Sequence, residues 1–393
     1  DVETFFNGVQ TITTESIPSA FRLHDYTRGD GIFTRSLNYD DDYFAATEFI
    51  DSTGTWELSD SDKVALDVHY SMEKAYDFFL EEFGRDSYSG SGAAIDCYVH
   101  YLENYKNAFF DGSSFVFGDG FGVNSSTQPY TSTDIVAHEF THGVASYTAN
   151  FEYLNESGAL EESFCDIFGI GVDFYANPGS ANWEMGDRGN TYMLRSLKEP
   201  KKLGDPDTYQ GEYWITDVFN DKGGVHSNSG VQNYWFYLLS EGGEGYNDNG
   251  DYYKVNPIGI DKALEVAYQT LTVYLGFISQ YADACFYSIQ STKDIYGQCS
   301  REVKEVTNAW HAVGLSEVYD SAVVADFDLK SIYNCGVPSV VSPVNTSLNG
   351  IDYIWKLNGT EVSTLEDPDI TLPAEGSYSL QLIANGTYGC WTS

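Results

Sequence analysis

The segment His138-Glu-Phe-Thr-His142 constrains this chain more than any other, because a second acidic segment, Glu161-Glu-Ser-Phe-Cys-Asp166, follows it closely. Residues four apart on a helix share one face, so the two imidazoles can hold one zinc ion. Glu139 lies between them and projects beside the ion, where a carboxylate can act as a general base. A catalytic zinc ion needs a third protein ligand and one open position. The second segment offers that ligand from another helix.

The residues around these segments favour two separate helices. Asp134 is a natural residue for the start of the first helix, and a turn at 155–158 predicts a break before the second. Glu162 and Asp166 are one turn apart, so both can face the first helix. Glu161 points to a different side from Glu162, so only one of this pair can reach the metal. Because so short a zinc motif arises by chance in unrelated proteins, these flanking residues strengthen the prediction.

Several further motifs stand in the order found in the thermolysin family of zinc endopeptidases, which the chain resembles over most of its length. The resemblance implies an α+β protein with a β-rich N-terminal lobe, a mostly helical C-terminal lobe and an active site in the cleft between them. The motifs that carry it, besides the two zinc segments, are Tyr26-Thr-Arg-Gly-Asp-Gly-Ile-Phe-Thr34, Asn107-Ala-Phe-Phe-Asp-Gly112, Phe117-Gly-Asp-Gly120, Leu194-Arg195-Ser196, Gly223-Gly-Val-His-Ser-Asn-Ser-Gly230 and Ala309-Trp-His-Ala-Val-Gly-Leu315.

The resemblance implies a role for each residue of the predicted catalytic site. It makes His138, His142 and Glu162 the zinc ligands, and Glu139 the base that takes a proton from water. Negative charge that builds on the peptide oxygen needs donors fixed in advance. A carboxylate behind a histidine fixes its ring and tautomer. The remaining matches are Tyr153 and His226 as donors to the oxyanion, Asp221 behind His226, and Asp166 behind His138.

Substrate contacts are also implied by the resemblance. One group of residues matches contacts to the substrate backbone, and another matches an apolar pocket for the side chain after the scissile bond. We therefore expect cleavage before Leu, Phe, Ile or Val, with broad specificity, because such pockets discriminate by only about 1–3 kcal/mol. The backbone contacts are Asn107, the Ala108 carbonyl and Arg195, and the pocket residues are Ile135, Met185 and Leu194.

Calcium is a second metal that the resemblance implies. Hard oxygen ligands from separate segments suit Ca²⁺ rather than a transition metal. Arg188 follows directly after one of these residues, and the stretch up to Arg195 is shorter than in thermolysin, so we expect one ion rather than two. The matching positions are Asp134, Asp173, Glu184 and Asp187, with Asn182 as a fifth.

Composition limits the partners and the location of the protein. The 20 Lys and Arg residues against 59 Asp and Glu residues give a formal charge of −39. Such a surface repels nucleic acid and anionic membranes, so we expect neither as a partner. No apolar run is long enough to span a membrane. The polar start at Asp1 favours a secreted, mature form freed of leader and propeptide, which acts as a monomer on protein and peptide substrates.

Six cysteines in a secreted chain predict disulfides without fixing their connectivity, because six allow fifteen pairings. Local pairing would close one loop near the end of the protease unit and another around the C-terminal segment. The remaining two cysteines are expected to form a third bridge beside the active site or to be packed, rather than to bind zinc. The three pairs are Cys285 with Cys299, Cys335 with Cys390, and Cys97 with Cys165.

The pattern along the chain predicts four segments. Residues 1–153 form the β-rich lobe and end in the zinc-binding helix, and residues 154–316 form the helical lobe. A linker at 317–332 leads to a small β-sandwich at 333–393, where short alternating strands are separated by Asn-Gly and Glu-Gly turns. This last segment resembles a PKD-like module, of which it can be an incomplete copy.

Two alternatives to an endopeptidase remain open. The first is a non-catalytic binding or adhesion protein on a protease scaffold. Such a protein usually loses the base, a zinc ligand or His226, whereas this chain keeps all of them. The second is a zinc aminopeptidase, which needs acidic residues that anchor a free amino terminus. The residues that flank the zinc segments match the endopeptidase pattern instead.

Overall fold

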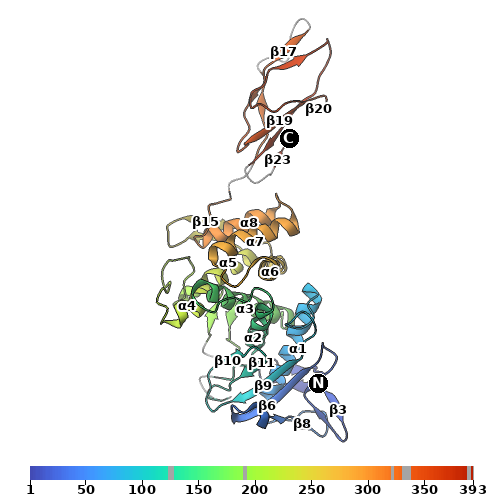
Figure 1. Ribbon diagram of the computed structural model, residues 1–393, viewed down its shortest axis with the longest axis vertical. Coiled ribbons are helices and arrows are strands. Elements are labelled where there is room, and N and C mark those ends of the chain that lie inside the picture. The colour runs from blue at the N-terminus through green and yellow to red at the C-terminus, as the bar shows by residue number, and fades with distance from the viewer. Residues whose placement is uncertain (123–127, 189–192, 320–322, 330–337, 387–390, 393) are drawn as a thin grey trace. The chain divides into compact units, whose positions relative to one another are not determined.

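A six-stranded mixed sheet organises the N-terminal part of the chain in the computed structural model (Figure 1). Strand β9 is parallel to β11 and β6, whereas β10 is antiparallel to β11 and lies at the sheet edge. The strand order is β10 (Ala108–Phe110), β11 (Ser114–Phe117), β9 (Ile95–Tyr101), β6 (Ile32–Asp40) and β5 (His24–Asp25), with β7 (Thr47–Glu48) paired to β6.

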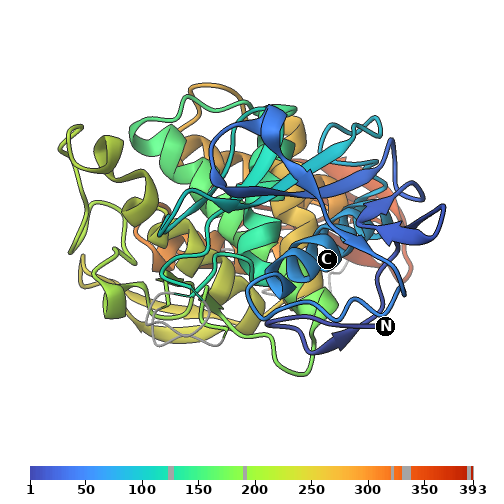
Figure 2. The same ribbon diagram turned by 90° about the horizontal axis from the view of Figure 1, so that it is seen from below.

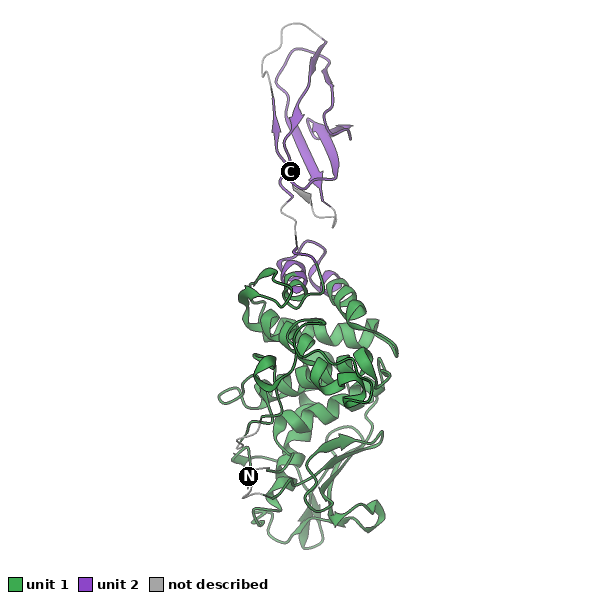
Figure 3. Cartoon of the chain, turned by 90° about the vertical axis from the view of Figure 1, so that its left-hand side faces the viewer, with its two compact units in different colours: residues 1–291, 308–316 green, residues 292–307, 317–393 purple. Residues whose placement is uncertain are grey.

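The structure describes residues 1–122, 128–188, 193–319, 323–329, 338–386 and 391–392. These residues divide into two compact units, coloured separately in Figure 3. The first contains 1–291 and 308–316, and the second contains 292–307 and 317–393. The smaller sheets of the first unit pair β1 (Val2–Glu3) with β2 (Val9–Gln10), and join β3 (Glu15–Ile17), β4 (Ala20–Arg22) and β8 (Ile50–Asp51).

Two helices cover the six-stranded sheet. Helix α1 (Lys63–Phe83) packs on β6 and β9, and α2 (Thr133–Ser146) packs on β10. Seen from below, the blue strands of the N-terminal part stand in front of the green helices (Figure 2). Gly84 ends α1 at φ 66°, a left-handed conformation that glycine adopts without a Cβ clash. The position of α2 against the edge strand brings its polar residues to the border of the sheet.

Helix α3 (Asn155–Ala176) lies against α2 at very short range. One close approach is at Gly169, where a Cβ atom would lie 2.6 Å from the carbonyl oxygen of Asp134 and 3.4 Å from the backbone nitrogen of His138. Real Cβ atoms do not approach an oxygen so closely, so this contact requires glycine. The predicted turn at 155–158 is wrong, because these residues form the first turn of α3 and the break lies at 147–154.

The second half of the first unit is mainly helical, as the sequence predicts. Its core includes Trp235, which stacks on Trp310 with ring centroids 4.8 Å apart. Helix α5 presents one of these rings and α8 presents the other. The helices that lie wholly or partly in this half are α4 (Asp221–Asn228), α5 (Gly230–Glu241), α6 (Ile260–Gln269), the π-helical η3 (Thr270–Tyr274), α7 (Tyr281–Tyr296) and α8 (Arg301–Ala312), of which residues 292–307 are assigned to the second unit. This half also contains the 3₁₀ turn η2 (Pro200–Leu203) and the hairpins β12–β13 (Glu184–Met185, Arg195–Ser196) and β14–β15 (Gly243–Tyr246, Tyr252–Val255), whereas the 3₁₀ turn η1 (Tyr43–Ala45) lies in the N-terminal half.

The C-terminal residues form short antiparallel strands around Trp355, whose side chain is fully buried with Ile370 and Leu382. The PKD-like assignment of this segment stays a prediction. One sheet has the order β20 (Thr360–Ser363), β19 (Asp352–Leu357), β22 (Leu380–Asn385), β23 (Trp391–Thr392), and the other pairs are β17 (Ser339–Val341) with β21 (Ile370–Leu372) and β16 (Phe327–Asp328) with β18 (Val344–Asn345).

The cysteines correct one predicted disulfide and decide between the two alternatives for another pair. Cys97 and Cys165 are both buried free thiols, so they are packed rather than bridged. Cys285 is also free whereas Cys299 is disulfide-bonded, so the predicted local pairing of these two is wrong. The predicted pair Cys335 and Cys390 lies outside the described residues. Within the described ranges, the helices are too short or too polar to cross a membrane.

Candidate active site

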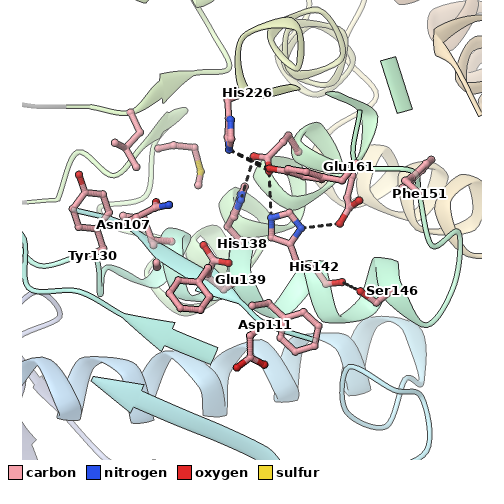
Figure 4. A pocket seen from close by; sticks show the side chains of 18 of the residues that line it. Asn107, Asp111, Tyr130, His138, Glu139, His142, Ser146, Phe151, Glu161 and His226 are labelled. Atoms are coloured by element: carbon pink, nitrogen blue, oxygen red, sulfur yellow. Dashed lines mark hydrogen bonds and ion pairs between the residues drawn. The ribbon is translucent and has the colours of Figure 1, made fainter. Parts of the chain in front are cut away.

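Helices α2 and α3 bring the two imidazoles of the first motif to one carboxylate of the second (Figure 4). Nε2 of His138 lies 3.5 Å from Oε2 of Glu162, and Nε2 of His142 lies 3.4 Å from its Oε1. The Glu162 side chain is 1% exposed, and its Oε2 has no hydrogen-bond partner among the described residues. A buried carboxylate oxygen without a donor, facing two imidazole nitrogens, fits a zinc ligand set of two histidines and one glutamate.

The opposite nitrogen of each histidine meets a second carboxylate. Nδ1 of His138 lies 2.9 Å from Oδ1 of Asp166, as the sequence predicts. Nδ1 of His142 lies 2.9 Å from Oε1 of Glu161, a contact that the sequence analysis missed. The neighbouring residues Glu161 and Glu162 therefore contact different imidazole nitrogens. Glu161 contacts Nδ1 of His142, and Glu162 faces the Nε2 atoms of both histidines. Such outer carboxylates orient the rings of metal-binding histidines.

Asp166 is the centre of a buried charge network. Arg195 donates two hydrogen bonds to it, from Nε at 2.6 Å and from Nη2 at 2.7 Å, and Asn233 Nδ2 donates a third at 2.8 Å. Burial raises the pKa of Asp166, but the charge of Arg195 and the bond to His138 outweigh it and lower the value to about 2. Asn233 lies on α5, far away in sequence, and no local pattern identifies it. The prediction has Arg195 hold a substrate carbonyl, and in the structure its guanidinium group is hydrogen-bonded to Asp166.

A thiol also lies close to the histidines. One ligand atom each of His138, His142 and Cys165 lie within 4.8 Å of one another. Cys165 is a buried free cysteine on α3, one turn after Glu161. Glu162 faces the Nε2 atoms of both histidines, at 3.5 Å and 3.4 Å, so it fits the third ligand position, with Cys165 as a neighbour of the site.

Polar side chains from three elements complete the centre. The hydroxyl of Tyr153 donates to Oε1 of Glu162 and lies 3.2 Å from Nε2 of His226. Nδ1 of His226 lies 2.6 Å from Asp221, the first residue of α4, and this contact fixes the orientation of the imidazole ring. Glu139 projects from α2 into the same space, and burial raises its pKa. A raised pKa suits a carboxylate that must accept a proton near neutral pH.

These groups open into one cavity of 570 Å³ (Figure 4). The cavity reaches the edge strand of the sheet, where Asn107 and Ala108 line it together with Tyr130. On its apolar wall, Leu194 donates a backbone hydrogen bond to Met185 at 2.8 Å. All predicted substrate-contact residues line this cavity: Asn107, Ala108, Ile135, Met185, Leu194 and Arg195.

An acidic cluster occupies the other end of the α2–α3 contact. Asp134 in the first turn of α2 and Asp173 near the end of α3 are 2% and 4% exposed. Burial raises the pKa of Asp134 to about 6, and the nearby charge of Asp173 adds to the rise. The hydroxyl of Ser132 and the N–H of Gly186 each donate to Asp134 at 2.5 Å. These two hydrogen bonds do not offset the burial of its charge.

The other residues predicted for calcium join this cluster. Asn182 donates to Asp187 at 2.8 Å and accepts from the N–H of Glu184 at 2.7 Å. Oε2 of Glu184 is buried without a hydrogen-bond partner among the described residues. Arg188 Nη2 lies 2.6 Å from Oδ2 of Asp173, so one internal cation is already present. Carboxylate and amide oxygens in this arrangement fit a calcium ion, with Arg188 neutralising part of the charge.

Family models match most of the chain. A model described as the catalytic domain of thermolysin metallopeptidases matches residues 2–146, and one described as their alpha-helical domain matches 149–315. The chain is 40% identical over 315 residues to the thermostable neutral protease NprT of Geobacillus stearothermophilus, and equally to a thermolysin of Alicyclobacillus acidocaldarius. Each alignment covers 77% of this chain and 54% of the relative, so the chain spans about half the length of these relatives.

A solved structure supports the same fold. The precursor of protealysin, a metalloproteinase from Serratia proteamaculans, aligns with a TM-score of 0.59 and 25% sequence identity. The alignment covers 74% of this chain and 89% of that chain. The predicted fold, a β-rich N-terminal part followed by a helical part, is thereby confirmed.

Proposed function

Because the chain belongs to the thermolysin family of metallopeptidases, we propose that it is a zinc-dependent endopeptidase. The observation that carries this proposal is the convergence on one cavity of His138, His142 and Glu162 with the acid Glu139 and the donor pair Tyr153 and His226. A catalytic centre needs this combination, whereas a binding scaffold does not.

The residues of the cavity account for each proton and charge of peptide hydrolysis. Zinc held by His138, His142 and Glu162 would make water nucleophilic near neutral pH and polarise a carbonyl. Glu139 takes a proton from the attacking water and returns it to the leaving amine. Tyr153 and His226 donate hydrogen bonds to the peptide oxygen as negative charge builds on it. Asp166, Glu161 and Asp221 keep the imidazoles of His138, His142 and His226 oriented, in that order.

The walls of the cavity favour extended peptides with an apolar side chain after the scissile bond. Strand β10 lies at the edge of its sheet, and an extended peptide can pair with a free strand edge. Ile135, Met185 and Leu194 line the cavity and offer an apolar surface to a bulky side chain. We therefore propose cleavage on the amino side of Leu, Phe, Ile or Val.

Further properties follow from the same proposal. The enzyme is secreted as a precursor whose propeptide is removed, and it acts as a monomer. A calcium ion bound by the acidic cluster stabilises the α2–α3 pair. The lobes at 1–153 and 154–316, the linker at 317–332 and the β module at 333–393 form its domain plan, in which the β module is a spacer.

The test is hydrolysis of casein and of a blocked Gly-Leu dipeptide amide by the parent chain and by Glu139→Gln, each with and without a zinc chelator. We expect cleavage before Leu by the untreated parent alone, with activity restored by added zinc. A parent that binds zinc fully but cleaves neither substrate would establish the binding-scaffold alternative. Cleavage only of substrates with a free amino terminus would establish an aminopeptidase.

A further inference from the structure

The turn before His226 carries a cation that the proposed mechanism does not use. Lys222 lines the cavity, and its Nζ lies 4.4 Å from the centroid of the Tyr153 ring. The side chain is exposed, and it forms no ion pair with any residue in the described ranges. A lysine ammonium is attracted to an aromatic face, so this contact holds the charge beside the reaction centre without neutralising it.

The backbone at this lysine is unusual. Four successive residues have left-handed φ angles, at 51° for Asp221, 50° for Lys222, 87° for Gly223 and 80° for Gly224. This region is unfavourable for residues with a Cβ, and residues held in it collect at functional sites. Asparagine tolerates this conformation better than lysine, so the turn itself gives no reason for a lysine at this position.

The charge of Lys222 contrasts with its surroundings. The cavity is lined by the acids Asp111, Glu139, Glu161 and Glu162, in a chain with a formal charge of −39. Arg195 also lines the cavity, but its charge is offset by its bidentate pair with Asp166. Without Lys222, an acidic substrate side chain would meet repulsion on entering this space.

The position of Lys222 indicates which substrate residue it faces. The residue after the scissile bond is assigned to the apolar wall of Ile135, Met185 and Leu194. Lys222 stands instead against Tyr153, whose hydroxyl contacts Glu162 and His226. We propose that Lys222 binds an acidic side chain on the amino side of the scissile bond, so that the enzyme prefers Glu or Asp there. This specificity rests on the proposed endopeptidase function.

The test compares kcat/KM for acetyl-Glu-Leu-amide and acetyl-Gln-Leu-amide in the parent, Lys222→Asn, Lys222→Arg and Lys74→Gln. Lys74 is a matched control, because it also lies over a tyrosine ring, Tyr70, but does not line the cavity. We expect the parent to prefer the Glu peptide by about fivefold, the size of an exposed charge pair. The preference should vanish in Lys222→Asn and persist in the other two variants.

Two results would overturn the assignment: a parent without the preference, or a preference that Lys222→Asn retains. A uniform loss on both peptides in Lys222→Asn would also overturn it, because the lysine would then only support Tyr153. Binding of the two peptides to Glu139→Gln, with and without Lys222→Asn, gives an answer that does not require turnover. If the parent cleaves nothing, the proposed function fails, and the Glu-over-Gln binding ratio still decides the role of Lys222.

Discussion

At the two ends of the α2–α3 contact, the pKa values of buried carboxylates are shifted in opposite directions. At the histidine end, Asp166 is surrounded by donors and cations, which lower its pKa to about 2 despite burial. At the other end, Asp134 is buried to a similar degree, but its charged neighbour is Asp173, and its pKa rises to about 6. The chain itself supplies the cation and the donors that stabilise ionised Asp166, whereas ionised Asp134 would gain from a cation supplied by the solution.

This difference separates two uses of metal in one helix pair. The histidine end is preorganised by protein charges, so an ion placed there is free to take part in chemistry. At the acidic end, Asp134 and Asp173 repel each other. A cation bound there would relieve this repulsion and so stabilise the folded state. The comparison predicts that substitutions at the two ends differ in sign as well as in size.

The largest effect is expected for Asp166→Asn. Removing this charge leaves Arg195 buried without its partner, and breaking a buried ion pair costs about 3–5 kcal/mol in the free energy of unfolding. Urea denaturation in a calcium chelator measures the loss. Asp173→Asn is the matched change at the acidic end and should cost clearly less, since it also relieves Asp134. Equal losses would mean that the two ends do not differ.

Calcium itself should give the next largest effect. Calcium at one hundred times its dissociation constant would stabilise the protein by about 2.7 kcal/mol, because only the folded state assembles the cluster. Thermal unfolding with calcium or with magnesium at equal ionic strength measures this as a shift in Tm. The shift should disappear in Asp134→Asn. If the Tm of the parent does not change when calcium is added, Arg188 alone compensates the negative charge of the cluster.

Without calcium, Asp134→Asn is expected to stabilise the protein by about 3 kcal/mol at pH 7. The reason is that the folded parent must keep an ionised Asp134 whose pKa is well above that of an unfolded Asp. Denaturant unfolding in a calcium chelator compares the two proteins. A loss of stability in this variant would mean that the hydrogen bonds from Ser132 and Gly186 outweigh the repulsion.

The pH dependence should show the same contrast with a slope of at most about 1.4 kcal/mol per pH unit for each group. The folded pKa of Asp134 is raised, so without calcium its contribution to stability falls as pH rises from about 4 to 6. The folded pKa of Asp166 is lowered, so its contribution is complete above about pH 4 and is lost as pH falls towards 2. The free energy of unfolding is measured against pH for the parent, Asp134→Asn and Asp166→Asn, and the difference between the parent and each variant gives the contribution of that carboxylate. If both differences changed with pH in the same direction, the contrast between the two ends would be refuted.

The sequence predicts the helices and the principal site because both depend on local spacing. His138 and His142 share a helix face, and Glu162 and Asp166 share another, so each pair is readable without a structure. The contact of Glu161 with His142 depends on how two helices cross, and the only local signal was its place beside Glu162. The disulfide prediction failed for Cys285 and Cys299, because proximity in sequence says little about which sulfurs meet, and the sequence alone could not decide between a bridge and packed thiols for Cys97 and Cys165.

Gly169 links the two ends that the predictions treat separately. It lies in contact with the backbone of α2 between Asp134 and His138, so the spacing of the helices is already at its minimum. The pair can widen but cannot close. A Gly169→Ala substitution would therefore displace both ends at once, and loss of metal binding would accompany loss of stability. Both ion sites therefore depend on the absence of a side chain at this one position, because it sets how closely α2 and α3 pack.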